Sequence, residues 1–169
     1  GYRFDLDDLG LDRAGGMRFD MIGTWLDELI TDPGAATGAD PYDCAGKHGG
    51  RCNATVSPVN PEWRHRLRAT WATPWDADLN VTWRHYGKVD RDTGATTELD
   101  YTFDAEDYFD VSASIGLPLN SRLRVGVNNI LDNDPPISDN VGTTGNGNTY
   151  PQTYESRGRW VFMGITVDM

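Results

Sequence analysis

The chain contains a row of three arginines at alternate positions, Arg64, Arg66 and Arg68. Alternate side chains of a β-strand share one face, so these like charges repel one another unless something offsets them. Candidate partners on neighbouring predicted strands are Asp20, Glu28 and Asp78. A second domain or an anionic ligand could serve instead. The pattern favours a structural charge ladder over ligand contact.

Residues that could carry catalysis do not gather in the sequence. The three histidines, His48, His65 and His85, are dispersed. The chain has no G-x-S-x-G elbow, no His-x-x-x-His pair, no P-loop and no G-x-G-x-x-G motif. We therefore expect no enzymatic activity and no cofactor.

The stretch "LDNDPPISDN" brings together Asp132, Asp134 and Asp139, whose oxygens could ligate Ca²⁺. Pro135 and Pro136 interrupt the run, and the spacing is not that of a calcium loop. Asp, Asn and Pro are ordinary turn residues at the end of a strand. We expect a turn here and no metal site.

Cys44 and Cys52 lie close together in the glycine-rich stretch "YDCAGKHGGRC". This closeness suits a disulfide that closes a small loop. Two free thiols remain an alternative, and a metal site is weaker because His48 alone does not complete a set of four ligands. If the bridge forms, the loop faces an oxidising space.

Polar and aromatic residues are frequent in the long predicted loops, above all in "SDNVGTTGNGNTYPQTYES". Such side chains offer hydrogen bonds and ring faces to a polar or sugar-like ligand, although they also describe any solvated loop. The candidate ligand-binding residues are Tyr42, His48, Arg51, Asp139, Asn140, Asn146, Asn148, Tyr150, Gln152 and Tyr154.

Composition restricts the class of protein. The 169 residues include 26 acidic and 15 basic side chains, a formal net charge of −11, which argues against nucleic acid as a partner. No apolar stretch approaches the roughly 20 residues of a transmembrane helix, and no signal peptide opens the sequence. The composition does not exclude a membrane β-barrel, because only alternate residues of its strands touch lipid.

Period-two alternation predicts an all-β fold, an antiparallel up-and-down meander of about seven strands. The predicted strands cover residues 2–7, 17–30, 63–73, 78–86, 109–117, 122–130 and 159–169. Short and long connections alternate strictly between them, so all short turns fall at one end of the sheet and all long loops at the other. Outer-membrane barrels show this asymmetry.

One face of the predicted strands is apolar and the other carries charges along the middle of the strands. In a barrel the charged face would line the lumen. The lumen-facing arginines would be Arg64, Arg66, Arg68, Arg84, Arg122 and Arg124. Two aromatic belts are expected, one with Trp25, Trp63 and Phe109 near the long loops and one with Phe19, Trp71 and Trp75 near the short turns. A soluble sandwich would explain the faces nearly as well.

Several stretches together resemble the C-terminal strands of a TonB-dependent outer-membrane receptor. They are "NPEWRHRLRATWATPWDADLNVTWRHYG", "RVGVNNILDNDPP", "GNTYPQTYESRGRWVFMGITVDM" and the "YDCAGKHGGRC" loop. The resemblance covers nearly the whole chain. It implies the last seven strands of a transmembrane barrel of twenty-two strands, so that the plug domain and the signal peptide lie outside this fragment.

The resemblance further implies TonB-energised uptake of a scarce ligand such as a siderophore, a cobalamin or an oligosaccharide. The implied partners are the TonB complex, the plug domain, the barrel assembly machinery and the lipid bilayer. The implied location is the bacterial outer membrane, with long loops extracellular and the C-terminus periplasmic.

The family's C-terminal assembly signal usually ends on an aromatic residue, whereas here Gly164, Val167 and Met169 fit its shape with Met in the last place. Two other readings stay open. One is a soluble β-sandwich module that binds carbohydrate, and the other is a structural or adhesive surface domain.

Overall fold

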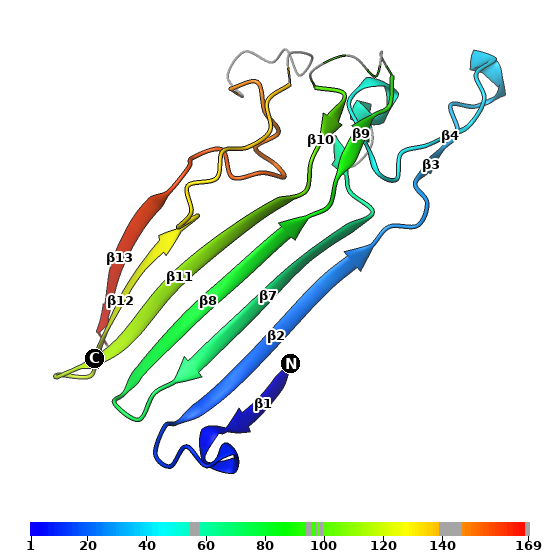
Figure 1. The fold of residues 1–169 in the computed structure, drawn as a ribbon. Helices are drawn as coiled ribbons and strands as arrows, with labels where there is room; N and C mark the ends of the chain where they lie inside the picture. Colours follow the sequence, from blue (N-terminus) through cyan, green and yellow to red (C-terminus); the bar gives the residue numbers. More distant parts are fainter. Residues whose placement is uncertain (55–57, 94–95, 97, 99, 139–146, 168–169) are drawn as a thin grey trace.

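The computed structural model describes residues 1–54, 58–93, 96, 98, 100–138 and 147–167. Seven strands form one antiparallel sheet in which each strand lies beside its neighbours in chain order (Figure 1). They are β1 (Tyr2–Asp5), β2 (Gly16–Trp25), β7 (Trp63–Ala72), β8 (Ala77–Tyr86), β11 (Glu106–Leu117), β12 (Ser121–Asn128) and β13 (Trp160–Val167). The predicted seven-stranded antiparallel sheet is confirmed.

The connections alternate as the sequence predicts. Short turns after β1, β7 and β11 lie at one end of the sheet, and the described parts of the long segments 26–62, 87–105 and 129–159 lie at the other (Figure 1). Asp76, Leu119 and Asn120 adopt positive φ values of 54°, 64° and 50° in two of the short turns. Tight turns of this kind need such residues, and Asn and Asp tolerate them best.

Several predicted bounds were wrong. The segment 17–30 is not one strand, because β2 ends at Trp25, opposite Trp63 where β7 begins, and has no partner strand beyond that point. Asp27 broke the alternation because it lies outside the strand. β1 ends at Asp5 and runs into a 3-10 helix, η1 (Leu6–Leu9). β11 begins earlier than predicted, at Glu106, because its first residues pair with the end of β8.

The long connections contain structure that alternation could not predict. A second sheet has the order β10 (Thr102–Phe103), β9 (Val89–Arg91), β5 (Lys47–His48) and β6 (Val59–Asn60). β3 (Ile30–Thr31) pairs with β4 (Tyr42–Asp43), and short 3-10 helices cover η2 (Ala35–Thr37) and η3 (Gly50–Ala54). Among the described residues no helix is long and apolar enough to cross a membrane.

The buried core lies at the long-loop end and includes only the ends of the large sheet's strands. Its members are Val59, Val89, Phe103, Tyr108, Tyr150 and Tyr154, with Tyr86 packed against them. We call β5, β6, β9, β10, the residues 43–54 and 92 around the disulfide, and the segment 147–156 the loop platform. Tyr86 and Tyr108 join it to the large sheet, since they stand at the ends of β8 and β11.

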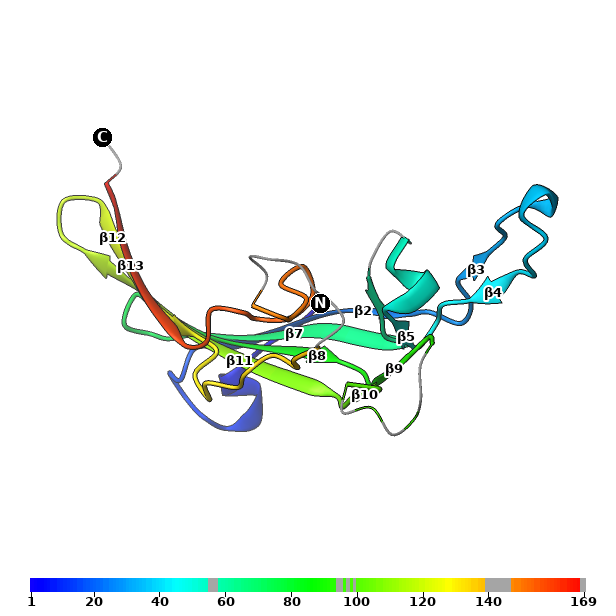
Figure 2. The same cartoon turned by 90° about the horizontal axis from the view of Figure 1, so that it is seen from above.

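The large sheet has one apolar and one polar face. Cross-strand partners repeat the same character, as in the row Leu67, Trp83 and Phe109 on the apolar face. Figure 2 shows β12 and β13 bending toward the side that holds the segment 147–158. Because Glu155 of that segment pairs with Arg84 on the polar face, the polar face is the concave one. The apolar face is convex.

Candidate functional site

The concave face carries all six arginines that were predicted to share one side. The register places Arg66 opposite Arg84 and Arg124 opposite Ser114, and Ser114 in turn lies opposite Asp78 of β8, so the side chains of these four strands alternate in phase. Arg84 binds both carboxylate oxygens of Asp110 at 2.9 Å and lies 3.6 Å from Glu155. This ion pair ties the third long loop to the sheet.

The predicted partners of the arginine row are engaged elsewhere. Asp20 pairs with Arg18 at 2.7 Å, although it lies opposite Arg68 in the register. Asp78 pairs with Arg122 at 3.2 Å. Glu28 lies beyond the end of β2.

Across the part of the chain that the structure describes, four arginines of the concave face form no ion pair. Among the six arginines that were predicted to share this face, the four are Arg64, Arg66, Arg68 and Arg124. The charge ladder predicted for the first three is therefore not balanced by the residues described.

A hollow of about 320 Å³ lies on the concave face and spans β7 to β13. Three of the unpaired arginines line it, together with amide, hydroxyl and ring groups such as Asn80, Ser112 and Phe162. The guanidinium of Arg124 lies 5.3 Å from the Phe162 ring centroid. Gly126 is required beneath that ring, because a Cβ there would lie 2.5 Å from the Phe162 Cζ atom.

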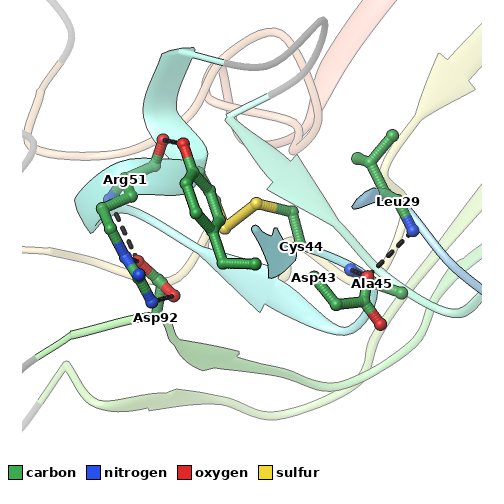
Figure 3. The surroundings of a disulfide bond; sticks show 8 residues. Leu29, Asp43, Cys44, Ala45, Arg51 and Asp92 are labelled. Atoms are coloured by element: carbon green, nitrogen blue, oxygen red, sulfur yellow. Dashed lines mark hydrogen bonds and ion pairs between the residues drawn. A yellow bond between two sulfur atoms is a disulfide. The ribbon is translucent and has the colours of Figure 1, made fainter. Parts of the chain in front are cut away.

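The predicted disulfide between Cys44 and Cys52 is present, and both residues are fully buried. Figure 3 shows Arg51 beside Asp92, whose carboxylate accepts two hydrogen bonds from the guanidinium, at 3.0 and 3.1 Å. The guanidinium also lies 4.3 Å from the ring centroid of Tyr42. These contacts surround the disulfide at the long-loop end of the molecule.

Asp43 organises the chain on the other side of the bridge (Figure 3). Its Oδ1 atom accepts the backbone N–H groups of Ala45 at 2.9 Å and Leu29 at 2.8 Å. These hydrogen bonds favour the ionised carboxylate and lower the pKa of Asp43.

Three of the ligand candidates belong to the core of the loop platform. His48 stacks on Phe103 at 4.0 Å, and the side chains of Tyr150 and Tyr154 are buried beside Phe103. Burial lowers the pKa of His48 and raises the pKa of both tyrosines. These three side chains do not present ring faces to solvent.

The remaining ligand candidates are spread over the outer end. Arg51, Asn148 and Gln152 are exposed and Tyr42 is half-buried. Three candidates lie outside the described residues, namely Asp139, Asn140 and Asn146. Gly164 and Val167 lie on β13, whereas Met169 is also outside the described residues.

The stretch "NNILDNDPP" forms a turn that connects strands. Asn129 and Asn133 exchange two hydrogen bonds at 2.9 and 3.0 Å, and the Asn133 amide donates to the Asp107 carbonyl at 2.7 Å. Asp132 accepts the backbone N–H of Arg159 at 2.7 Å. The described residues contain no group of three or more side chains placed to hold a metal ion.

A polar network that the sequence analysis missed lies on the convex face beside the long loops. The Trp83 indole N–H donates to Asp107, and the His85 Nδ1 atom lies 2.8 Å from the same carboxylate. The strand register would have indicated this network, because it places Asp107 of β11 opposite His85 of β8.

Comparison of the chain with protein-family models, with curated proteins and with solved structures finds no match. Function must therefore be argued from the two faces of the sheet and from the loop platform.

Proposed function

We propose that this chain forms part of the wall and the outer loops of a bacterial outer-membrane barrel of the TonB-dependent receptor type. One observation carries the proposal: the convex face of the sheet is apolar and exposed. On β13, Met163 is 78% exposed and Val161 is 73% exposed. Apolar surface of this extent calls for a covering phase or partner.

The direction of curvature favours lipid as that covering. A soluble β-barrel closes around its apolar side chains, which places them on the concave face. An outer-membrane barrel has the opposite arrangement, with an apolar outer band and a polar lumen. Here Arg66, Arg68 and Ser112 line the hollow of the concave face at mid-strand. The side chain of Val111 alternates with that of Ser112 and lies opposite Val81, which places it on the convex face.

Aromatic side chains lie at the two ends of the strands. Trp25 and Trp63 pair across β2 and β7 at the long-loop end, with ring centroids 6.4 Å apart. Trp71 and Trp75 lie at the short-turn end, 6.1 Å apart. Tryptophans prefer the boundary between lipid and water, so these pairs support a sheet that spans the bilayer between them.

In this proposal the loop platform faces the outside of the cell and the short turns face the periplasm. The receptor would take up a siderophore, a cobalamin or an oligosaccharide, with energy supplied through TonB. The chain contributes barrel wall and loops. The plug domain and the contact with TonB would come from other parts of the protein. The barrel assembly machinery would insert the barrel into the outer membrane.

Paired cysteine substitutions test the proposal. The protein is made in full length in a Gram-negative host, and outer-membrane vesicles are treated with lipid-soluble and water-soluble maleimides. Val111→Cys should react with the lipid-soluble reagent and resist the water-soluble one. Its matched control, Ser112→Cys, points to the opposite face and should show the reverse preference.

A product that stays monomeric and soluble without detergent would overturn the membrane assignment and favour a β-sandwich module. Equal labelling of the two positions by the water-soluble reagent in vesicles would also contradict it.

A further inference from the structure

We propose that a polar row on the convex face, at the long-loop end of the sheet, binds the uncharged sugar headgroup of a membrane glycolipid. The row consists of His65, His85 and Asp107, and the rings beside it are Trp63 and Trp83. The inference rests on the proposed function, because a lipid headgroup reaches this face only where the sheet crosses a bilayer. It goes further by assigning a lipid-binding site and the chemistry of its headgroup.

The polar row interrupts an otherwise apolar part of the face. Strand register places His65 of β7 opposite His85 of β8, and His85 opposite Asp107 of β11. The rows on either side are apolar and mostly aromatic. The row toward the loops holds Trp25 and Trp63, and the row toward the middle of the sheet holds Leu67, Trp83 and Phe109.

The charge of Asp107 and the neighbouring tryptophans place this row among lipid headgroups. An ionised carboxylate at the centre of a bilayer costs about 2.5–3.5 kcal/mol, and the side chain of Asp107 is 41% exposed. Tryptophans prefer the boundary between lipid and water, and Trp25 in the next row outward is 65% exposed. In the proposed barrel Asp107 therefore meets headgroups and not acyl chains.

Hydrogen bonds within the row determine which atoms donate and which accept. The indole N–H of Trp63 donates to the Nδ1 atom of His65 at 3.0 Å, so this imidazole carries its proton on Nε2. The Nδ1 atom of His85 lies 2.8 Å from Oδ1 of Asp107 and donates to it, so Nε2 of the neutral ring is an acceptor. The Trp83 indole N–H donates to the same Oδ1 atom, which leaves Oδ2 of Asp107 as a second acceptor.

The groups that these bonds leave over match the hydroxyls of a sugar. The described residues provide no hydrogen-bond partner for the Nε2 atoms of His65 and His85 or for Oδ2 of Asp107. A hydroxyl both donates and accepts, so neighbouring hydroxyls of one sugar ring satisfy a donor and two acceptors together.

The rings beside the row form a platform for the apolar face of a sugar. The Trp63 indole lies over Gly23, where a Cβ atom would be 2.5 Å from its Cη2 atom. The Trp83 ring stacks on Phe109 with centroids 6.0 Å apart, and His65 makes a T-shaped contact with Trp83 at 4.5 Å. Sugar C–H groups pack on such rings while the hydroxyls reach the polar row.

The acidic member of the row disfavours a phosphate headgroup. Phosphate is bound by Arg and Lys side chains, whereas Arg64, Arg66 and Arg84 of the same strands lie on the concave face. The carboxylate of Asp107 would repel a second anion. An uncharged headgroup avoids this repulsion and still accepts and donates hydrogen bonds.

Lipid retention tests the inference. The full-length protein is inserted into nanodiscs that contain equal amounts of monogalactosyl and phosphocholine lipids with identical acyl chains, and native mass spectrometry counts the lipids that stay bound. The native protein should retain the galactolipid in preference. Asp107→Asn exchanges an acceptor oxygen for an amide, and His65→Phe keeps a ring without the donor. Each should lower the ratio of retained galactolipid to phosphocholine lipid about three- to tenfold.

Two control variants isolate the row. Asp78→Asn makes the same chemical change on the concave face of β8, where the carboxylate pairs with Arg122. Trp75→Phe changes an exposed ring at the short-turn end. Both should leave the ratio unchanged. A third lipid with the same chains, phosphatidate, reports any preference for phosphate.

Equal retention of galactolipid and phosphocholine lipid by the native protein would overturn the inference. An unchanged ratio in both Asp107→Asn and His65→Phe, or a preference for phosphatidate over the galactolipid, would also overturn it. Membrane insertion is scored separately by the cysteine labelling above. An inserted protein without headgroup preference would refute the sugar site alone, whereas a soluble product that binds free lactose would refute both the barrel and the glycolipid.

Discussion

The loop platform buries its apolar side chains, whereas the large sheet leaves those of its convex face exposed. In the platform, Phe103, Tyr150 and Tyr154 are each 3% exposed and pack against one another. On the sheet, Met163 and Ile165 are 78% and 64% exposed. The platform has the organisation of a small water-soluble domain, whereas the sheet leaves its apolar face to whatever surrounds it.

In the barrel proposed above, this difference would mark the boundary between water and lipid. A domain in water must cover its own apolar side chains, and the platform adds a disulfide and the Arg51–Asp92 ion pair to a small core. A sheet in lipid has no such need, and in the proposed barrel the bilayer would cover the convex face. The boundary between the two regions runs through Trp25, Trp63 and Trp83.

Phe103→Ala should give the largest effect and break only the platform. Its ring stacks on His48 and touches Tyr150 and Tyr154, so removing it opens a cavity that costs about 3–5 kcal/mol of local stability. Hydrogen exchange of β5, β9 and β10 measures the loss. The amides of β7 and β8 should keep their protection.

Phe109→Ala is the control, because this ring stacks on Trp83 on the convex face and not on the platform core. Protection of β9 should stay unchanged in it. If Phe103→Ala exposed the large sheet as well, the two regions would form one cooperative unit and the comparison would be invalid.

Val111→Arg should impair assembly of the large sheet in the membrane and leave the loop platform folded. An arginine at the middle of the lipid-facing surface costs about 2–4 kcal/mol in an outer-membrane barrel. The amount of urea-resistant folded protein in the outer membrane should fall. Ser112→Asn, one residue away and on the concave face, is expected to assemble normally.

Normal assembly of Val111→Arg would contradict contact between this face and lipid. A defect of equal size in Ser112→Asn would show instead that the strand is sensitive to any change.

The sequence predicted the sheet because its long strands carry a strong period-two signal. Leu79, Val81 and Trp83 alternate with Asn80 and Thr82, and register then follows from the short turns. The bounds of β2 were missed because Ile22 on the polar face, with Leu26 and Asp27 beyond the strand, blurred the alternation.

The loop platform could not be predicted in this way, because strands of two residues, such as β5 and β6, have no periodicity. His48, Tyr150 and Tyr154 were expected at a ligand surface because aromatic and polar loop residues often bind. Their burial depends on contacts with Phe103 and Tyr86 from distant parts of the chain. The closeness of Cys44 and Cys52 in the sequence predicted the disulfide but left two free thiols as an alternative, and the structure shows the bridge.

Cys44→Ser combined with Cys52→Ser should have an intermediate effect confined to the platform. The bridge spans a sequence separation of 8 residues, and closing so short a loop contributes about 2–3 kcal/mol in the chain-entropy model. Limited proteolysis should cut near η3 sooner in the double variant than in the native protein.

Reducing the native protein, under conditions that make the buried bridge accessible, should likewise make proteolysis near η3 faster. Mass mapping provides the control, and two free thiols in the assembled native protein would contradict the bridge. Faster cleavage in the short turns at the other end would contradict its local role.

Lowering the pH should destabilise the loop platform through protonation of His48, and this should be the smallest of the predicted effects. Burial lowers the pKa of this imidazole, and the nearby Arg91 charge acts in the same direction, whereas Asp100 and the backbone of Tyr101 oppose them. The folded state therefore holds His48 neutral more strongly than the unfolded chain does. Above about pH 6.5 both states are neutral and the contribution is constant.

As the pH falls below about 6.5, the unfolded loop takes up the proton first and the platform loses stability, until the folded pKa is also passed. Hydrogen exchange of β9, corrected for intrinsic rates and compared at matched pH, should show protection falling toward pH 5 in the native protein. His48→Phe, which keeps a ring against Phe103 and has no titrating group, should lose that dependence. His65→Gln on the convex face should keep it, because His65 lies on the sheet outside the platform core. A native platform as protected at pH 5 as at pH 7.5 would mean that Asp100 stabilises the charged imidazole enough to cancel the cost of burying it.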